Sequence, residues 1–346
     1  MVGASFEGWE PPPDAFAVVM ATGIVAVAGY DHGYWRLGIA LSAVAVIAFG
    51  ALALGFVRWA ANRPVGVAER TRDPDVTLRM FTFVAACAVL GVRFDDYLAL
   101  VWLLGGLALA AWLVLVPLAL AAAGSRSGRE LREQARGAWL LPSVATAGLA
   151  ITAADLAIGH RAAALVIIAT VAWGLGMVFY LAVTALIACR VLAKPVRPDE
   201  VTPDSWILMG ALAITALAGD HILTAARALR APAGLAGWTG PVTHGVWALA
   251  SLWIPVLLYA QLWRADQVPG SLRYRSAWWA AVFPLGMYSA TCAATATELD
   301  IRSLQTLSLV FFWIAFTVWT LVAIGGLRQI SRSGNSTSRS TACSSG

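Results

Sequence analysis

Long apolar stretches recur along the whole chain, and short polar segments separate them. A membrane-spanning helix needs about 20 mainly apolar residues, and ten stretches approach or exceed that length. The fourth, sixth and tenth are the longest, each with at least 25 consecutive uncharged residues. The predicted helices cover residues 14–30, 37–58, 76–93, 97–123, 138–158, 162–190, 204–227, 240–263, 275–298 and 303–327.

The ninth stretch is interrupted near its middle. Residues 278–297 read WWAAVFPLGMYSATCAATAT and carry no charge, but Pro284 follows Phe283 inside them. A proline deletes one helical hydrogen bond and kinks the helix, which leaves the Ala280 carbonyl without its usual donor. In a membrane such a carbonyl is tolerated only against protein or a water-filled cavity. Three hydroxyls beyond the break share one face of the helix: Tyr288, Thr291 and Thr295. Both a pore-lining segment and a helix kinked for packing fit this pattern.

Composition agrees with an all-α integral membrane protein. Of the 346 residues, 60% are hydrophobic and only 12% are charged, against about 25% charged in soluble domains. The net charge of +5 does not indicate nucleic-acid binding, because its distribution follows the polar segments between helices. No CxxC or Cys/His spacing indicates a metal or another cofactor. No catalytic motif is present either, so a transport protein is expected rather than an enzyme.

The positive charges alternate between the two sides of the predicted helices. Counting the termini with every second loop places 18 of the 24 lysines and arginines on one side. Since positive residues stay in the cytoplasm, this split predicts ten spans in the plasma (inner) membrane with both termini cytoplasmic. The domain prediction is one transmembrane unit over 1–330 and a Ser-rich, disordered cytoplasmic tail over 331–346.

The odd-numbered helices resemble one another, which predicts five helical hairpins in a repeat. Four of them open with a proline in or before the first turn, and all five end near an acid. A nearby arginine is expected to pair with that acid and close each hairpin: Arg36, Arg93, Arg161, Arg227 and Arg302. Five hairpins around an axis would leave a central pore lined by the odd helices, with the more uniformly apolar even helices against lipid.

Hydroxyl and small residues inside the odd helices are the candidate pore residues. They are Thr22, Gly23, Thr82, Thr146, Thr215, Tyr288 and Thr291. Small-residue packing is an equally good interpretation of the first two.

Two acids lie inside apolar stretches and are candidates for proton coupling. They are Asp155 and Asp220, and the competing interpretation pairs them with Arg161 and Arg227 at the outer surface. The four histidines lie near that same predicted surface and have no metal-ligand spacing, which favours ordinary loop residues.

Two motifs near opposite ends of the chain carry a family resemblance. The opening PPPDAFAVVMATGIV resembles the first-helix signature of the tellurite-resistance/dicarboxylate transporter family, and WWAAVFPLGMYSAT resembles its Trp-Trp…Phe-Pro signature. That family includes slow-type anion channels and malic acid and sulfite transporters. The resemblance implies five hairpins around a pore, often in a homotrimer, with Phe283 as an aromatic gate beside Pro284.

The predicted function is passage of small anions across the bilayer through a pore gated by Phe283. Dicarboxylates such as malate, sulfite, and inorganic or tellurite-related oxyanions are all open as substrates. An alternative is a proton-coupled C4-dicarboxylate or sulfite carrier that uses the outer carboxylates. A membrane-embedded enzyme or sensor is a third possibility, for which no catalytic set appears.

Overall fold

A computed structural model describes residues 10–63, 66, 69–231 and 233–343, and it is helical almost throughout. The α-helices are α1 (Ala17–Asp31), α2 (Trp35–Asn62), α4 (Pro74–Met80), α5 (Thr82–Arg93), α6 (Leu98–Gly124), α7 (Gly128–Gln134), α8 (Leu141–His160), α9 (Ala163–Ala193), α10 (Ile207–Ala228), α11 (Ala233–Gln267), α12 (Trp279–Leu299) and α13 (Arg302–Cys343). Short 3-10 turns η1 (Gly137–Leu140), η2 (Pro198–Glu200), η3 (Pro203–Trp206) and η4 (Ser276–Trp278) lie before or between them. The described residues contain no strand, so the all-α prediction is confirmed.

Each predicted span overlaps a helical segment, and eight segments of the described chain are long and apolar enough to cross a membrane. The remaining two are α1, which is a shorter apolar helix, and α12. The chain is therefore a multi-pass membrane protein. The count of ten spans stays a prediction, because it depends on α1 and α12 crossing as well.

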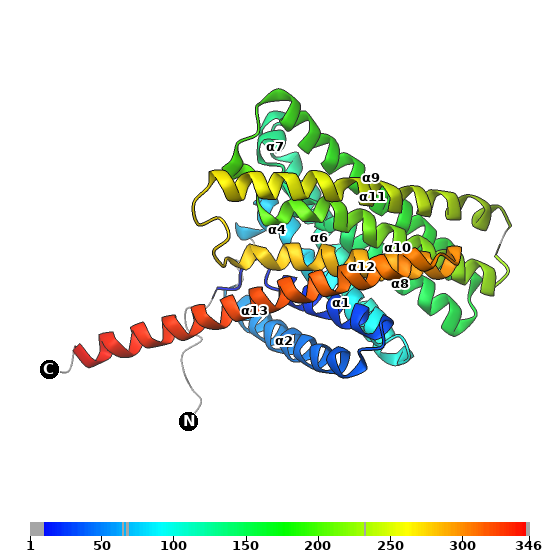
Figure 1. The fold of residues 1–346 in the computed structure, drawn as a ribbon, viewed down its shortest axis with the longest axis horizontal. Helices are drawn as coiled ribbons and strands as arrows, with labels where there is room; N and C mark the ends of the chain where they lie inside the picture. Colours follow the sequence, from blue (N-terminus) through cyan, green and yellow to red (C-terminus); the bar gives the residue numbers. More distant parts are fainter. Residues whose placement is uncertain (1–9, 64–65, 67–68, 232, 344–346) are drawn as a thin grey trace.

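Several boundaries differ from the predictions, among them the start of α11 at Ala233 rather than at residue 240. The first helix begins at Ala17, after a turn that contains Asp14, and the third span breaks at Phe81 into α4 and α5. At that break the Thr82 hydroxyl donates to the Arg79 carbonyl, 3.0 Å away, which replaces part of the helical bonding. Composition predicted a disordered tail over 331–346, whereas the backbone of 331–343 continues α13 as helix (Figure 1). No proline follows the apolar part of α13, so nothing in the sequence interrupts its hydrogen bonds; residues 344–346 lie outside the described residues.

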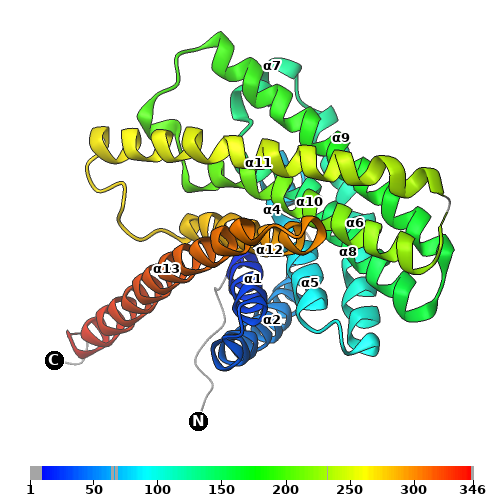
Figure 2. The same ribbon diagram turned by 45° about the vertical axis from the view of Figure 1, so that its right-hand side comes forward.

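Five helices form a closed ring. In order around it, α1 contacts α5, α5 contacts α8, α8 contacts α10, α10 contacts α12, and α12 contacts α1. The other long helices pack outside this ring, and α2 and α11 lie on opposite sides of it in both Figure 1 and Figure 2. Hairpins repeated along the sequence thus give an inner layer of odd-numbered spans and an outer layer of even-numbered spans.

Burial separates the two layers. In their most apolar stretches, between 61% and 89% of the residues are buried for the spans built on α5, α8 and α10. The corresponding share for the outer helices is 11% to 28%. Large apolar side chains on the outer helices are open to the surroundings, among them Ile47, Leu120, Leu192 and Leu321. In a membrane protein such residues contact lipid, so the outer layer separates the ring from the bilayer.

Small residues let the ring helices approach closely. A Cβ added to Gly210 on α10 would lie 2.8 Å from Pro284 on α12, and one added to Gly23 on α1 would lie 2.8 Å from Val89 on α5. Contacts below 3.0 Å force neighbouring atoms apart, and the rigid Pro284 ring cannot move aside as a flexible side chain does. Gly210 therefore fixes the distance between α10 and α12, which is one continuous helix with Pro284 inside it.

Gly210→Ala is expected to destabilise the protein by about 1–3 kcal/mol, the usual cost of overpacking a closely packed contact. Thermal unfolding in a fixed detergent measures the change. Gly174→Ala on α9 is the matched control, since a Cβ there meets no atom within 4 Å. If both variants unfold at the same temperature, Gly210 does not set the distance between these helices.

Candidate functional site

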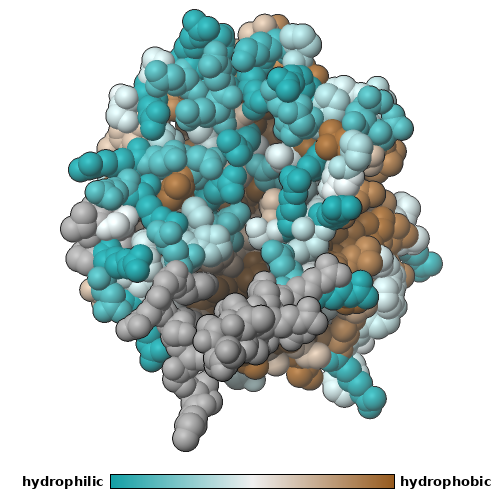
Figure 3. Space-filling view, turned by 90° about the vertical axis from the view of Figure 1, so that its left-hand side faces the viewer, coloured by the Kyte–Doolittle hydropathy of each residue, from teal (hydrophilic) through white to brown (hydrophobic). Residues whose placement is uncertain are grey.

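A cavity of about 80 Å³ lies where the five ring helices begin. Every helix of the ring, or the turn that leads into it, contributes to its wall. The lining residues are Asp14, Ala17, Met20, Arg79, Thr82, Arg136, Ala138, Leu141, Thr202, Asp204, Ile207, Ala277 and Ala280. We call this space the N-terminal cavity, because the N-terminal ends of the ring helices surround it. The end of the molecule that carries both termini faces the viewer in Figure 3 and is largely hydrophilic there.

Parallel helix N-termini make this end of the ring attractive to anions. The first turns of an α-helix carry free N–H groups and about half a positive charge. Pro284 adds a feature within α12, because its ring leaves the Ala280 carbonyl without a helical donor and Ala280 lines the cavity. The sequence predicted that this carbonyl would face protein or a cavity, and it belongs to a cavity-lining residue.

The arginines of the cavity are held by carboxylates. Arg79 lies 3.4 Å from Asp14 and 3.1 Å from Asp75, and Arg136 lies 3.4 Å from the same Asp75. Asp204 accepts a hydrogen bond from the Ala138 amide at 3.0 Å. These contacts tie α1, α4, η1 and η3 together around the cavity. They also neutralise much of the positive charge of these arginines, which leaves the helix N-termini as the main source of positive potential.

Phe283 is fully buried on α12, with 0% of its surface exposed. It lies one helical turn beyond Ala280, away from the N-terminal cavity and toward the middle of the ring. Its neighbour Pro284 is the residue that contacts Gly210 on α10. The rigid contact of the Pro284 side chain with Gly210 therefore lies next to the bulky Phe283 side chain.

Thr82 is the predicted hydroxyl residue that lines the N-terminal cavity. The hydroxyl of Thr22 instead accepts the indole N–H of Trp319 on α13, at 2.9 Å. That of Thr146 accepts from Trp112 on α6 at 2.8 Å. Both hydroxyls thus accept a hydrogen bond from a tryptophan on an outer helix rather than from another helix of the ring.

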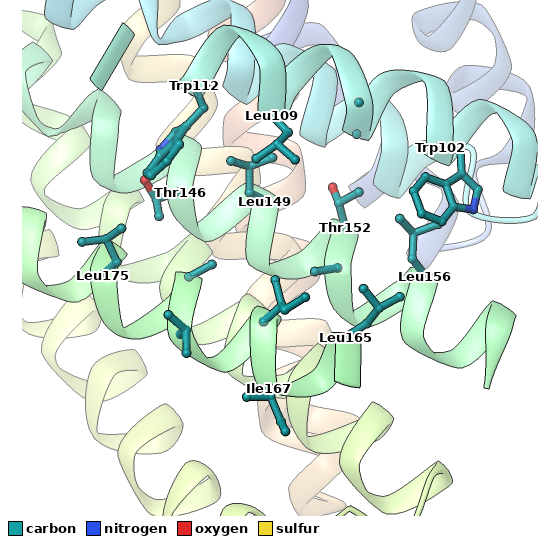
Figure 4. A pocket seen from close by; sticks show the side chains of 16 residues that line it. Trp102, Leu109, Trp112, Thr146, Leu149, Thr152, Leu156, Leu165, Ile167 and Leu175 are labelled. Atoms are coloured by element: carbon teal, nitrogen blue, oxygen red, sulfur yellow. The ribbon is translucent and has the colours of Figure 1, made fainter. Parts of the chain in front are cut away.

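Thr146 also lines a lateral pocket of about 470 Å³ between α6, α8 and α9. Figure 4 shows Trp112 beside Thr146 at one end of this pocket and Trp102 at the other, with leucines between them. Such an apolar wall cannot solvate an anion, since burying an unpaired charge is costly. The pocket lies on the outer side of the ring, where lipid chains would meet it.

The hydroxyls of the remaining predicted residues bond within their own helix or to a neighbouring helix. Thr215 donates to the Ala211 carbonyl of its own helix at 2.6 Å, and Thr291 on α12 donates to the Ala213 carbonyl of α10 at 2.8 Å. The Tyr288 hydroxyl lies 2.8 Å from Ser251 on the outer helix α11. All three are buried and satisfied within the protein. Gly23, as described above, is a contact between α1 and α5.

Carboxylates gather at the opposite end of the ring, around His221. The Nδ1 atom of His221 on α10 lies 2.6 Å from Asp155 on α8. Each ring helix supplies one acid, in its C-terminal half or just after its end, and each acid interacts electrostatically with His221 or with another member of the group: Asp31, Asp95, Asp155, Asp220 and Glu298. We call these five acids and His221 the acidic cluster. Asp220 also accepts from Thr295 on α12, at 3.4 Å.

The cluster corrects two predictions about this end. Among the described residues, none of the five arginines is ion-paired with the acid of its own hairpin turn; Arg227 instead joins Glu298 of the next hairpin at 2.7 Å, and Arg93 lies over the Tyr30 ring. His221, predicted to be an ordinary loop residue, lies inside α10 and holds Asp155. The sequence signal was the adjacent pair Asp220-His221 in an apolar stretch, since ionisable residues inside a membrane helix usually have partners. Among the described residues no group of three or more His, Cys, Asp or Glu is placed to hold a metal ion.

Comparison with known proteins agrees with this architecture. The family model described as voltage-dependent anion channel matches residues 11–327. An uncharacterized membrane protein of Mycobacterium tuberculosis is 36% identical over 168 residues, which cover 46% of this chain and 83% of that protein. Two uncharacterized transporters of Methanocaldococcus jannaschii are 22% and 21% identical, and each alignment covers at least 90% of both chains. The family is one of transport proteins rather than enzymes. The chain therefore belongs to the SLAC1 family of anion channels and transporters, the tellurite-resistance/dicarboxylate transporter family that its two motifs resemble.

Proposed function

We propose that this protein passes small anions along the axis of the five-helix ring, between the N-terminal cavity and the acidic cluster. The observation that carries the proposal is the convergence of parallel helix N-termini on one cavity at the end of a closed ring. Helix N-termini bind anions through free N–H groups without placing a full charge in the membrane. Anions that bind there can also leave, which a buried unpaired arginine would prevent.

Phe283 is the proposed gate of this path, and Pro284 its hinge. The aromatic ring is large, fully buried and one turn from the cavity, so its rotation would change the width of the axis. The proposed substrates are small anions such as malate-like dicarboxylates, sulfite and inorganic or tellurite-related oxyanions. The proposal further includes a homotrimer in the plasma membrane with cytoplasmic termini, and it assigns the protein no catalytic activity.

Of the predicted pore residues, Thr82 fits an axial position best because it lines the cavity. Thr22, Thr146, Thr215, Tyr288 and Thr291 fit structural positions better, since they do not line that cavity and their hydroxyls bond within or between helices.

Purified protein in liposomes tests the proposal directly. Efflux of chloride, nitrate, sulfite, malate and succinate is measured against empty liposomes of the same lipid, with and without a pH gradient. At least one anion is expected to leave faster than from empty liposomes, while potassium does not. Permeation no faster than the empty-liposome rate for the whole panel contradicts an anion pathway.

A second candidate is a proton-coupled anion carrier, and the 2.6 Å contact between His221 and Asp155 favours it. Paired imidazole and carboxylate groups can take up and release protons as an anion passes. A coupled carrier would accumulate anion when a pH gradient is applied, and Asp220→Asn would reduce that accumulation. Uptake that ignores both the gradient and this variant excludes coupling through the acidic cluster.

A further inference from the structure

Arg264 is a buried arginine that the axial pathway does not use. It lies near the C-terminal end of α11, outside the ring, and only 4% of its surface is exposed. Two of its three guanidinium nitrogens, Nε and Nη1, are buried without a hydrogen-bond partner. Within the described part of the chain it forms no ion pair with an acid.

The surroundings of Arg264 do not supply the missing negative charge. One turn earlier, Gln261 donates to the Thr202 carbonyl at 3.1 Å, so this face of α11 lies against the segment that leads into η3. Asp204 in η3 attracts Arg264, but its Oδ2 atom already accepts from the Ala138 amide. Arg275 acts on Arg264 as a like charge. Arg264, Arg275 and Asp204 together therefore carry one more positive than negative charge.

A buried guanidinium in this state is energetically unfavourable. Buried charges in proteins are normally paired, and a buried donor without an acceptor loses its hydration without compensation. The C-terminal end of α11 favours a cation through the helix dipole, but its carbonyls do not bond Nε or Nη1. An external anion would supply both the charge and the acceptors.

We propose that Arg264 is the centre of an oxyanion-binding site, separate from the axial path and assisted by Arg275. The guanidinium group suits phosphate and carboxylate oxygens, which accept several N–H bonds at once. Two sources offer this chemistry at the largely hydrophilic end of the molecule in Figure 3: the phosphate of a membrane lipid and a free oxyanion in the water. The site does not depend on the function proposed for the ring.

Thermal unfolding with inorganic phosphate tests the free-anion source. The wild type, Arg264→Gln and Arg273→Gln are purified in a maltoside detergent that contains no phosphate. Arg273 is the matched control, because it is an exposed arginine in the loop that follows the same helix. Phosphate is expected to raise the unfolding temperature of the wild type and of Arg273→Gln. Arg264→Gln should bind phosphate at least about tenfold more weakly, because the neutral amide keeps neither the charge nor the paired N–H donors of the guanidinium group.

Native mass spectrometry tests the lipid source. The same three proteins are reconstituted into nanodiscs of phosphatidylglycerol and are then extracted into the maltoside detergent. The wild type and Arg273→Gln are expected to retain bound phosphatidylglycerol that Arg264→Gln loses. Retention with no phosphate response identifies the lipid headgroup as the ligand, and the converse identifies the free oxyanion.

The proposal is overturned if Arg264→Gln matches the wild type in both measurements, whether both bind or neither does. If Arg264→Gln does not fold, Arg264→Lys is used: it keeps the charge but offers fewer, differently placed donors, and a severalfold loss of phosphate or lipid binding is expected. Unchanged binding in Arg264→Lys then counts against the site. Flux through the ring is a separate readout, so failure here leaves the anion pathway standing.

Discussion

Phe283→Ala is expected to increase anion flux through reconstituted protein by about tenfold or more, because lowering a barrier by about 1.4 kcal/mol raises a rate tenfold. The proposed gate is a fully buried ring one turn from the N-terminal cavity. Truncating it to a methyl group leaves space on the axis that a hydrated or partly hydrated anion can use. Stopped-flow anion efflux from liposomes, corrected for the amount of folded protein, measures the change.

Loss of a large aromatic also destabilises a protein, by about 3–5 kcal/mol, and looser packing alone could leak ions. Phe312→Ala separates the two effects. Phe312 is equally buried but lies on the outer helix α13, stacked on Tyr34 at 5.4 Å. The control is expected to lose stability without gaining flux. Equal flux from the two variants, or wild-type flux from a folded Phe283→Ala, would remove the gate from the proposal.

The helical layout followed from local rules in the sequence. Apolar length predicted where each helical segment lies, and alternating positive charge predicted hairpins. The hairpin repeat predicted an inner layer of odd-numbered helices, which the closed ring of α1, α5, α8, α10 and α12 confirms. Pro284 likewise predicted that the Ala280 carbonyl would lack its helical donor and face protein or a cavity, because a missing N–H is a covalent property of proline.

The directions of side chains could not be read in the same way. Thr22 was a reasonable pore residue by composition, but its hydroxyl is fixed by Trp319, almost three hundred residues away in sequence. Thr146 is fixed by Trp112 on a neighbouring helix. A hydroxyl on a helix faces whichever neighbour offers a donor, and that neighbour is set by tertiary packing rather than by helical period. The same holds for Phe81, where α4 and α5 separate without any proline or glycine at the break.

His221 shows a third kind of difference. The sequence shows His221 next to Asp220 inside an apolar stretch. Ionisable groups in membrane helices usually have partners, so a partner could be expected for each of these two residues. What the sequence did not give was convergence: Asp31, Asp95 and Asp155 come from other hairpins. Parallel ring helices bring their C-terminal ends together, so one acid per hairpin becomes a cluster of five.

Acidifying the side of the membrane that faces this acidic cluster is expected to raise anion uptake from that side severalfold. A carboxylate about 10 Å from a passing anion opposes it by about 0.4 kcal/mol in water, close to a factor of two. Arg227, paired with Glu298, offsets part of this repulsion, and so does His221 beside Asp155 when its imidazole is protonated. Neutralising several carboxylates therefore multiplies the rate, while salt at physiological strength screens the more distant ones.

Asp95 is a member of the acidic cluster whose protonation illustrates the direction of the pH effect. It lies in the turn between α5 and α6, and partial burial, together with repulsion from Asp96 and Asp155, raises the pKa of its carboxyl above the ordinary value for aspartate. A raised pKa means that Asp95 gains its proton at a higher pH than a free aspartate. As the pH falls through that raised pKa its negative charge disappears, so repulsion of the anion decreases and uptake increases.

Asp95→Asn isolates this contribution, because the neutral amide mimics the protonated acid at every pH. The variant is expected to take up anion about twofold faster than the wild type at neutral pH and to respond less to acid. Asp300→Asn is the control, an exposed acid at the same end whose left-handed backbone, φ 53°, asparagine also adopts readily.

Electrostatic repulsion by the acidic cluster depends only on the pH of the side that it faces, so it weakens even when both sides are equally acidic. Proton coupling, in contrast, requires a pH gradient across the membrane. Faster uptake at symmetric acidic pH, reproduced by Asp95→Asn and absent from Asp300→Asn, would thus assign the pH effect to the field at the end of the ring. An effect seen only under a gradient would assign it to a coupled proton and exclude the electrostatic explanation.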